Sequence, residues 1–235
     1  MPTPTTRTPK CLAWVLAGLL VAAAPLAQSQ VAPSASQVAA YRGLHAAAHQ
    51  GNEKRLQRPA TPAELNATDD HGRTPLHVAA FARQRGAIRA LARAGADLNQ
   101  LENDRYDAVT IAAVADDEET LRVLLELGAN AGQTTSRYDG TTLIAAAHLG
   151  HDGVVRQLIA AGAPLDHVNN LHWTAVIEAI VLGDGGTRHQ ATLRALIDAG
   201  ARLSLTDRQG QTPLQLARAR GYTAMVQMLE KAGAP

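Results

Sequence analysis

The chain has 235 residues, and its 22 Lys and Arg against 21 Asp and Glu leave a formal net charge of +1. This near-equal number of basic and acidic residues excludes the basic excess on which nonspecific nucleic-acid binding depends. The single cysteine, Cys11, lies near the start of the chain, so the remaining sequence offers no thiol for a disulfide or for a cysteine nucleophile.

The first 29 residues follow the pattern of a secretory signal peptide. Arg7 and Lys10 precede an apolar run over residues 11–24, and Ala27-Gln28-Ser29 fits a cleavage site of small residues. The apolar run is shorter than the roughly 20 residues that a transmembrane helix needs. A cleaved signal is therefore the preferred interpretation, and an uncleaved membrane anchor is the alternative.

A cleaved signal peptide over residues 1–29 predicts that the protein acts outside the cytoplasm, in the periplasm. We expect no contact with the membrane beyond export. We expect residues 30–38 to form a short flexible lead-in, because nothing in their sequence indicates a domain. The rest of the chain, 39–235, is expected to form one domain.

One short pattern recurs through this domain. A Gly-Ala pair preceded by Ala or Leu places its glycine at Gly95, Gly128, Gly162, Gly200 and Gly233, with spacings of 33, 34, 38 and 33 residues. A period near 33 indicates a stack of like units, each of which contacts only its neighbours. The expected repeats are approximately 39–68, 69–101, 102–135, 136–168, 169–206 and 207–235.

Each unit has the signals of two helices. A Thr-Pro-Leu start, as at Thr74-Pro75-Leu76, supplies an N-cap and a proline that loses no hydrogen bond in the first turn. The second helix has apolar residues at i, i+3 and i+4, as in Ile88-Leu91-Ala92, and Gly95 ends it because glycine tolerates a left-handed backbone. The predicted fold is therefore all-α, a solenoid of about six helix-turn-helix units joined by short hairpin loops.

These markers resemble the ankyrin repeat, whose hallmark is Thr-Pro-Leu-His-x-Ala followed by a second helix and a Gly-Ala turn. Thr74-Pro75-Leu76-His77-Val78-Ala79 carries the hallmark, and Thr212-Pro213-Leu214-Gln215-Leu216-Ala217 repeats it with one change. The resemblance implies that His77 and His45 hydrogen bond to backbone. Residues 139–151 and 169–175, together with the Gly-Asp-Gly-Gly stretch at 183–186, are similar to a group of bacterial exported ankyrin proteins to which no common chemistry is assigned.

The resemblance implies a noncatalytic scaffold, most simply a monomer without a cofactor, that binds a protein or an extended peptide by its hairpin tips and the concave face of its first helices. The residues at matching positions with chemistry suited to binding are Phe81, Tyr106, Tyr138, His148 and Trp173. Tyrosine and tryptophan are favoured at interface hot spots. For Phe81 and Trp173, packing between repeats is an equally weighted alternative.

The fifth repeat is longer than the others, and its extra residues fall in Gly183–His189. The simpler interpretation is a tolerated, mobile insertion. The functional interpretation is a finger that contacts the partner through Asp184 and Arg188. It lacks the lysine of a phosphate-binding loop.

Charged residues alternate between neighbouring repeats. One period of 33 added to Arg83 gives Asp116, and the same step from Arg85 gives Glu118. We expect a ladder of exposed ion pairs between repeats, with separate basic and acidic docking patches as the alternative.

The alternative function is a metal-dependent or hydrolytic activity in repeats 4 and 5, around His148, His151, His172 and Asp184. A zinc site needs three or four converging ligands. No His-Glu-x-x-His pattern is present, so we expect neither a metal nor an active site.

Overall fold

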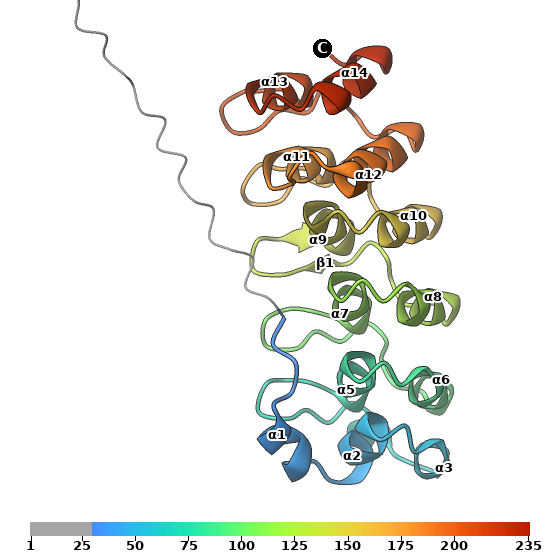
Figure 1. Cartoon of the computed structure of the whole chain (residues 1–235). Coiled ribbons are helices and arrows are strands. Elements are labelled where there is room, and N and C mark those ends of the chain that lie inside the picture. The colour runs from blue at the N-terminus through green and yellow to red at the C-terminus, as the bar shows by residue number, and fades with distance from the viewer. Residues whose placement is uncertain (1–29) are drawn as a thin grey trace, which may run out of the picture.

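The computed structural model describes residues 30–235, and the predicted signal peptide lies outside them. Six antiparallel helix pairs stack in chain order (Figure 1). The first helices of the pairs form one layer, comprising α2 (Gly43–His49), α5 (Pro75–Phe81), α7 (Ala108–Val114), α9 (Thr142–Leu149), α11 (Ala175–Val181) and α13 (Pro213–Ala219). The second helices form the other layer, comprising α3 (Glu53–Leu56), α6 (Arg85–Ala94), α8 (Glu118–Glu126), α10 (Asp152–Ala160), α12 (Thr187–Asp198) and α14 (Thr223–Lys231). The predicted solenoid is confirmed.

Two further helices and one short hairpin complete the described elements: α1 (Ala35–Ala40), α4 (Pro62–Leu65), β1 (Thr134–Thr135) and β2 (Gly140–Thr141). The strands pair antiparallel, with Thr134 opposite Thr141. The loops between repeats project on the side of the first helices, away from the second helices (Figure 1). Within residues 30–235, no helix combines the length and apolar character needed to span a membrane.

The first turn of α5 shows why the repeat begins where it does. Thr74 caps α5 and forms a capping box with His77, and Pro75 occupies the first helical turn. The His77 ring accepts at Nδ1 from the Thr74 N–H over 3.0 Å, and its Nε2 lies 3.2 Å from the backbone oxygen of Tyr106. His45 makes the matching contact to the backbone oxygen of Arg73 at 2.9 Å. These histidines therefore join consecutive repeats, as the sequence predicted.

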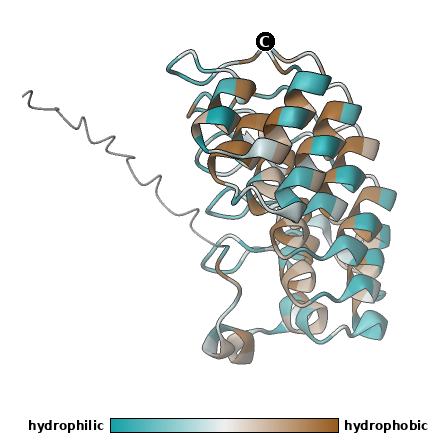
Figure 2. Cartoon of the chain, turned by 45° about the horizontal axis from the view of Figure 1, so that its top comes forward, coloured by the Kyte–Doolittle hydropathy of each residue, from teal (hydrophilic) through white to brown (hydrophobic). Residues whose placement is uncertain are grey.

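The core lies between the two helix layers and between successive repeats. Leucine, isoleucine and valine from both helices are buried, and alanines such as Ala79 and Ala146 let the first helices approach closely. The hydrophilic residues lie on the outward surfaces of the helices and on the loops (Figure 2). In repeats 2–6 a glycine with a left-handed backbone lies at or directly after the C-cap of the second helix, for example Gly95 with φ of 96° at the end of α6. In repeat 1, α3 ends at Gln57 without a glycine.

The lead-in expected over residues 30–38 differs from the structure, because its second half belongs to α1. Ser34 caps α1 in a capping box with Gln37. Val31 accepts a hydrogen bond from Arg73 Nη1 at 3.4 Å, and the Tyr41 hydroxyl donates to Asp69 at 2.9 Å. The segment before the first repeat is thus attached to the side of the stack that carries the loops.

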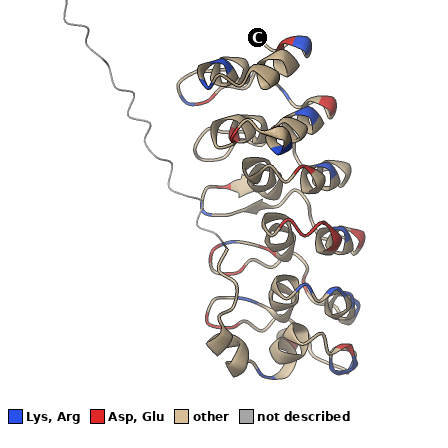
Figure 3. Ribbon diagram, viewed as in Figure 1, with Lys and Arg blue, Asp and Glu red and all other residues tan. Residues whose placement is uncertain are grey.

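The ion pairs between repeats 2 and 3 form one residue away from the predicted register. Arg83 Nε lies 3.6 Å from Asp117 Oδ2, and an Arg85 nitrogen lies 3.8 Å from Glu119 Oε2. Asp116 has the same left-handed backbone as Arg83, but its carboxylate accepts from Arg188 instead. Basic residues on α6 and acidic residues at the start of α8 consequently lie on adjacent repeats (Figure 3).

Candidate functional site

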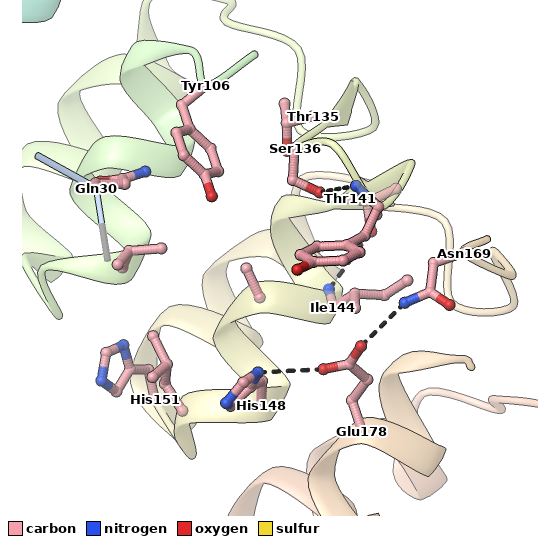
Figure 4. A pocket seen from close by; sticks show the side chains of 15 residues that line it. Gln30, Tyr106, Thr135, Ser136, Thr141, Ile144, His148, His151, Asn169 and Glu178 are labelled. Atoms are coloured by element: carbon pink, nitrogen blue, oxygen red, sulfur yellow. Dashed lines mark hydrogen bonds and ion pairs between the residues drawn. The ribbon is translucent and has the colours of Figure 1, made fainter. Parts of the chain in front are cut away.

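A pocket of about 340 Å³ opens between the hairpin loops and the first helices of repeats 3–5 (Figure 4). Tyr106 enters it from the loop before α7, and Tyr138 enters it from the β1–β2 hairpin. His148 and Glu178 line it from α9 and α11. The remaining lining residues are Gln30, Val114, Thr135, Ser136, Gly140, Thr141, Ile144, Ala145, Leu149, His151 and Asn169.

The two tyrosines are positioned by backbone contacts of their loops. Tyr106 N–H donates to a Glu102 carboxylate oxygen at 3.0 Å, and its carbonyl accepts from the Glu102 N–H at 3.0 Å. Tyr138 donates its N–H to Ser136 Oγ at 3.3 Å, and its carbonyl accepts from Asn170 N–H at 2.9 Å. Both side chains are half-buried, and burial raises the pKa of Tyr106. Two half-buried aromatic rings therefore line the loop side of the pocket.

Glu178 places a carboxylate at the bottom of the pocket. Its side chain is only 7 % exposed, and Oε1 accepts from Asn169 Nδ2 at 2.9 Å. Its Oε2 lies 3.3 Å from Nδ1 of His148, whose side chain is 25 % exposed (Figure 4). Among the described residues that line the pocket, none is Lys or Arg. The pocket is thus apolar and aromatic above one buried acidic group.

The insertion in repeat 5 contacts the neighbouring repeats. The Asp184 carboxylate accepts from Gly186 N–H at 2.8 Å and faces His189 Nδ1 at 2.8 Å, and these two contacts lower its pKa. His189 Nε2 lies 2.9 Å from the backbone oxygen of His148 in repeat 4. On the other side, the Tyr222 hydroxyl of repeat 6 donates to the Gly183 carbonyl at 2.8 Å.

Arg188 reaches back across a whole repeat. Its Nη2 donates to Asp116 Oδ2 at 2.7 Å, and its Nε lies 3.7 Å from Asp152 Oδ1. His151 Nδ1 lies 2.9 Å from the backbone oxygen of Ala113 and 3.8 Å from Asp116. Asp184 and Arg188, predicted to contact a partner, thus make contacts within the chain while staying accessible.

The structure brings only part of the predicted site together. Tyr106, Tyr138 and His148 line one pocket. Phe81 and Trp173 lie outside it and are half-buried against the core, as Tyr106 also is, so the packing alternative for these two residues stays a prediction. Asp184 and Arg188 also lie outside the pocket lining.

The residues of the alternative metal or hydrolytic site have separate surroundings. His148 faces Glu178, His151 faces the Ala113 carbonyl and Asp116, and Asp184 faces His189, while His172 is exposed in its loop. Over residues 30–235, no group of three or more His, Cys, Asp or Glu side chains is arranged to hold a metal ion. No observation favours this alternative.

Sequence reasoning missed Glu178 and Asn169. Glu178 stands four residues after the helix cap, where the corresponding residues of repeats 2, 3 and 6 are Val78, Ile111 and Leu216. All three are buried apolar residues. A glutamate at a position that is apolar in these repeats was the sequence signal that could have identified Glu178 as a candidate functional residue.

The chain resembles known proteins over nearly all of this stack. The family model described as ankyrin repeats (3 copies) matches residues 44–135, 109–207 and 143–234. The ankyrin repeat protein YahD of Escherichia coli is 35 % identical over 190 residues, which cover 80 % of this chain and 94 % of YahD.

Solved structures show the same architecture. The crystal structure of an ankyrin repeat domain (ABAYE2397) from Acinetobacter baumannii AYE is 42 % identical, with a TM-score of 0.76, and covers 82 % of this chain and 98 % of that domain. The ankyrin repeat domain of Bcl-3, a member of the IkappaB protein family, is 26 % identical with a TM-score of 0.73 over 83 % of this chain and 87 % of that domain. Hallmark, fold and relatives agree, and the chain belongs to the ankyrin repeat family.

Proposed function

We propose that the protein is a noncatalytic scaffold that acts outside the cytoplasm. It binds a protein or an extended peptide along a groove, which we define as the pocket between the hairpin loops and the first helices of repeats 3–5. Ankyrin repeat proteins generally serve as protein-binding scaffolds. The observation that carries the proposal for this chain is the pocket between hairpins and first helices, where Tyr106 and Tyr138 present half-buried rings. Aromatic residues of this kind contribute much of the energy of protein interfaces.

The test is affinity capture with the exported form of the protein from a periplasmic extract, followed by direct binding of the purified partner. Tyr138→Ala is expected to weaken capture without loss of the helical circular dichroism signal. Tyr41→Ala, which removes a half-buried tyrosine of repeat 1 outside the pocket, is the matched control. Equal capture by the Tyr138 variant and the native protein would contradict the placement of the site.

Export is the second part of the proposal, supported by the sequence pattern of residues 1–29. Cell fractionation with N-terminal sequencing tests it. A soluble periplasmic protein that begins near Gln30 is expected. Recovery in the membrane fraction with an intact N-terminus would indicate an uncleaved anchor, and recovery in the cytoplasm would contradict export.

A further inference from the structure

We propose that the pocket selects an arginine side chain of the bound peptide, which enters along Tyr106 and Tyr138 and pairs its guanidinium with Glu178. This inference rests on the proposed function, because it names the chemistry that the groove would recognise.

The first argument is the hydrogen-bonding capacity of the Glu178 carboxyl group. The side chain is 7 % exposed, and its neighbours at hydrogen-bond distance are Asn169 and His148. An ionised carboxylate offers about four lone-pair sites, so one on each oxygen is still available. Burying a carboxylate is costly, and an entering cation would offset part of that cost.

The second argument is that no Lys or Arg of the described chain faces Glu178, whose basic neighbour is the imidazole of His148 at 3.3 Å. The pocket lining over residues 30–235 contains no Lys or Arg. Arg188 is the basic residue of the neighbouring insertion, and it is already paired with Asp116 at 2.7 Å and with Asp152 at 3.7 Å. A guanidinium or ammonium partner for Glu178, in addition to His148, would therefore come from the ligand.

The third argument is the shape and chemistry of the walls. Val114, Ile144 and the two tyrosines provide apolar surface on which the methylene stem of a long side chain can pack. Tyrosine faces attract cations, and a planar guanidinium both stacks on such rings and forms two parallel bonds with a carboxylate. An ammonium group is a compact point charge and gains less from this geometry, so arginine is favoured over lysine.

The fourth argument is that the fold does not require an acid here. Val78, Ile111 and Leu216 occupy the corresponding positions in other repeats and are buried apolar residues. Gln30 also lines the pocket, and its buried Nε2 has no hydrogen-bond partner among the described residues.

The experiment titrates the full exported protein with N-acetyl-glycyl-arginyl-glycine amide, followed by NMR chemical shifts. Two further peptides replace the arginine with citrulline, its neutral isostere, or with lysine. We expect the arginine peptide to bind about tenfold or more tightly than the citrulline peptide, with lysine between them. Because the citrulline comparison uses the unaltered protein, it is independent of any folding defect.

Variants locate the site. Glu178→Gln is expected to weaken the arginine peptide about tenfold or more and to leave the citrulline peptide unchanged. Glu230→Gln, which alters an exposed glutamate of α14 paired with Arg218, is the control and should bind like the native protein. Absence of binding, equal binding of arginine and citrulline, or an unchanged affinity in Glu178→Gln would each overturn the inference. If capture still depends on Tyr138 in that case, the proposed function stands and only the arginine chemistry fails.

Discussion

Arg188 and Asp116 are 72 residues apart in sequence, yet Arg188 Nη2 lies 2.7 Å from Asp116 Oδ2. The pair connects the fifth repeat to the third and passes beside the fourth, where Asp152 lies 3.7 Å from the same guanidinium. Most contacts in a repeat stack are between nearest neighbours, so this ion pair is an exception that the insertion makes possible.

Arg188→Ala is expected to lower the free energy of unfolding by no more than about 1 kcal/mol, because the arginine side chain is 53 % exposed and water screens the pair. Urea denaturation followed by circular dichroism measures the change. Arg194→Ala, an exposed arginine on the same helix, is the control. If Arg188→Ala abolishes partner capture while stability is retained, its role as a partner contact is supported over a purely structural one.

Gly183→Ala should destabilise the protein by about 2 kcal/mol, within the range for overpacking. A Cβ at this position would overlap the backbone oxygen of Ala179 and the ring of His189. Gly162→Ala is the comparison, since its φ of 81° is strained for alanine but its Cβ would meet open space. Thermal denaturation of the two variants compares steric overlap with backbone strain. An unaffected Gly183 variant would indicate that the insertion rearranges freely.

His77 should make stability depend on pH. Burial lowers the pKa of His77 from 6.5 to about 4. Between these values the unfolded chain binds a proton that the folded chain does not, so stability is full above pH 6.5 and falls as the pH drops towards 4. The loss approaches about 3 kcal/mol once the pH has fallen to about 4, where the folded state also begins to bind the proton. Denaturation midpoints at several pH values from 7 to 4 test this.

His77→Gln is the matched variant, because Gln215 occupies the corresponding position of repeat 6 and its Oε1 accepts from Thr212 N–H at 2.9 Å. The variant should retain the cap of α5 and show a smaller loss of stability between pH 6.5 and 4. A loss equal to that of the native protein would assign the pH dependence to other groups.

Leu143→Ala is expected to cost about 2–5 kcal/mol, since this fully buried side chain is replaced in a central repeat with neighbours on both sides. Met225→Ala should cost less. Met225 is also fully buried, but its repeat packs against a neighbour on one side and can open without unfolding the whole stack. Equilibrium unfolding of both variants compares them, and a larger effect at Met225 would show that the end repeat stabilises the domain as much as its centre.

The repeat architecture could be predicted from the sequence because its signals are local. Thr74, Pro75 and His77 specify the start of α5 within four residues, and Gly95 specifies the end of α6. The contact between His77 and the Tyr106 backbone, 29 residues apart, has a counterpart in the preceding repeat between His45 and the Arg73 backbone, 28 residues apart. A contact that repeats with the period of the chain can be read from that period.

Contacts that occur only once in the stack could not be predicted from local sequence patterns. The helix at Ala35–Ala40 precedes the first repeat and has no counterpart from which to infer it. Arg83 pairs with Asp117 instead of Asp116, because Asp116 is engaged by Arg188 from the insertion. The spacing of residues predicts which carboxylate of the next repeat lies near an arginine. It does not predict that an arginine from a third repeat pairs with that carboxylate first.

By itself, the sequence determined the family, the all-α stack and the positions of Tyr106, Tyr138 and His148 on the side that carries the groove, because each depends on a short pattern or on its period. Only the tertiary structure decided that these residues share one pocket with Glu178 and Asn169, and that Phe81 and Trp173 do not. The physical reason is that the pocket forms between three successive repeats. Its charge and shape therefore depend on how side chains from separate helices and loops pack, which no single repeat encodes.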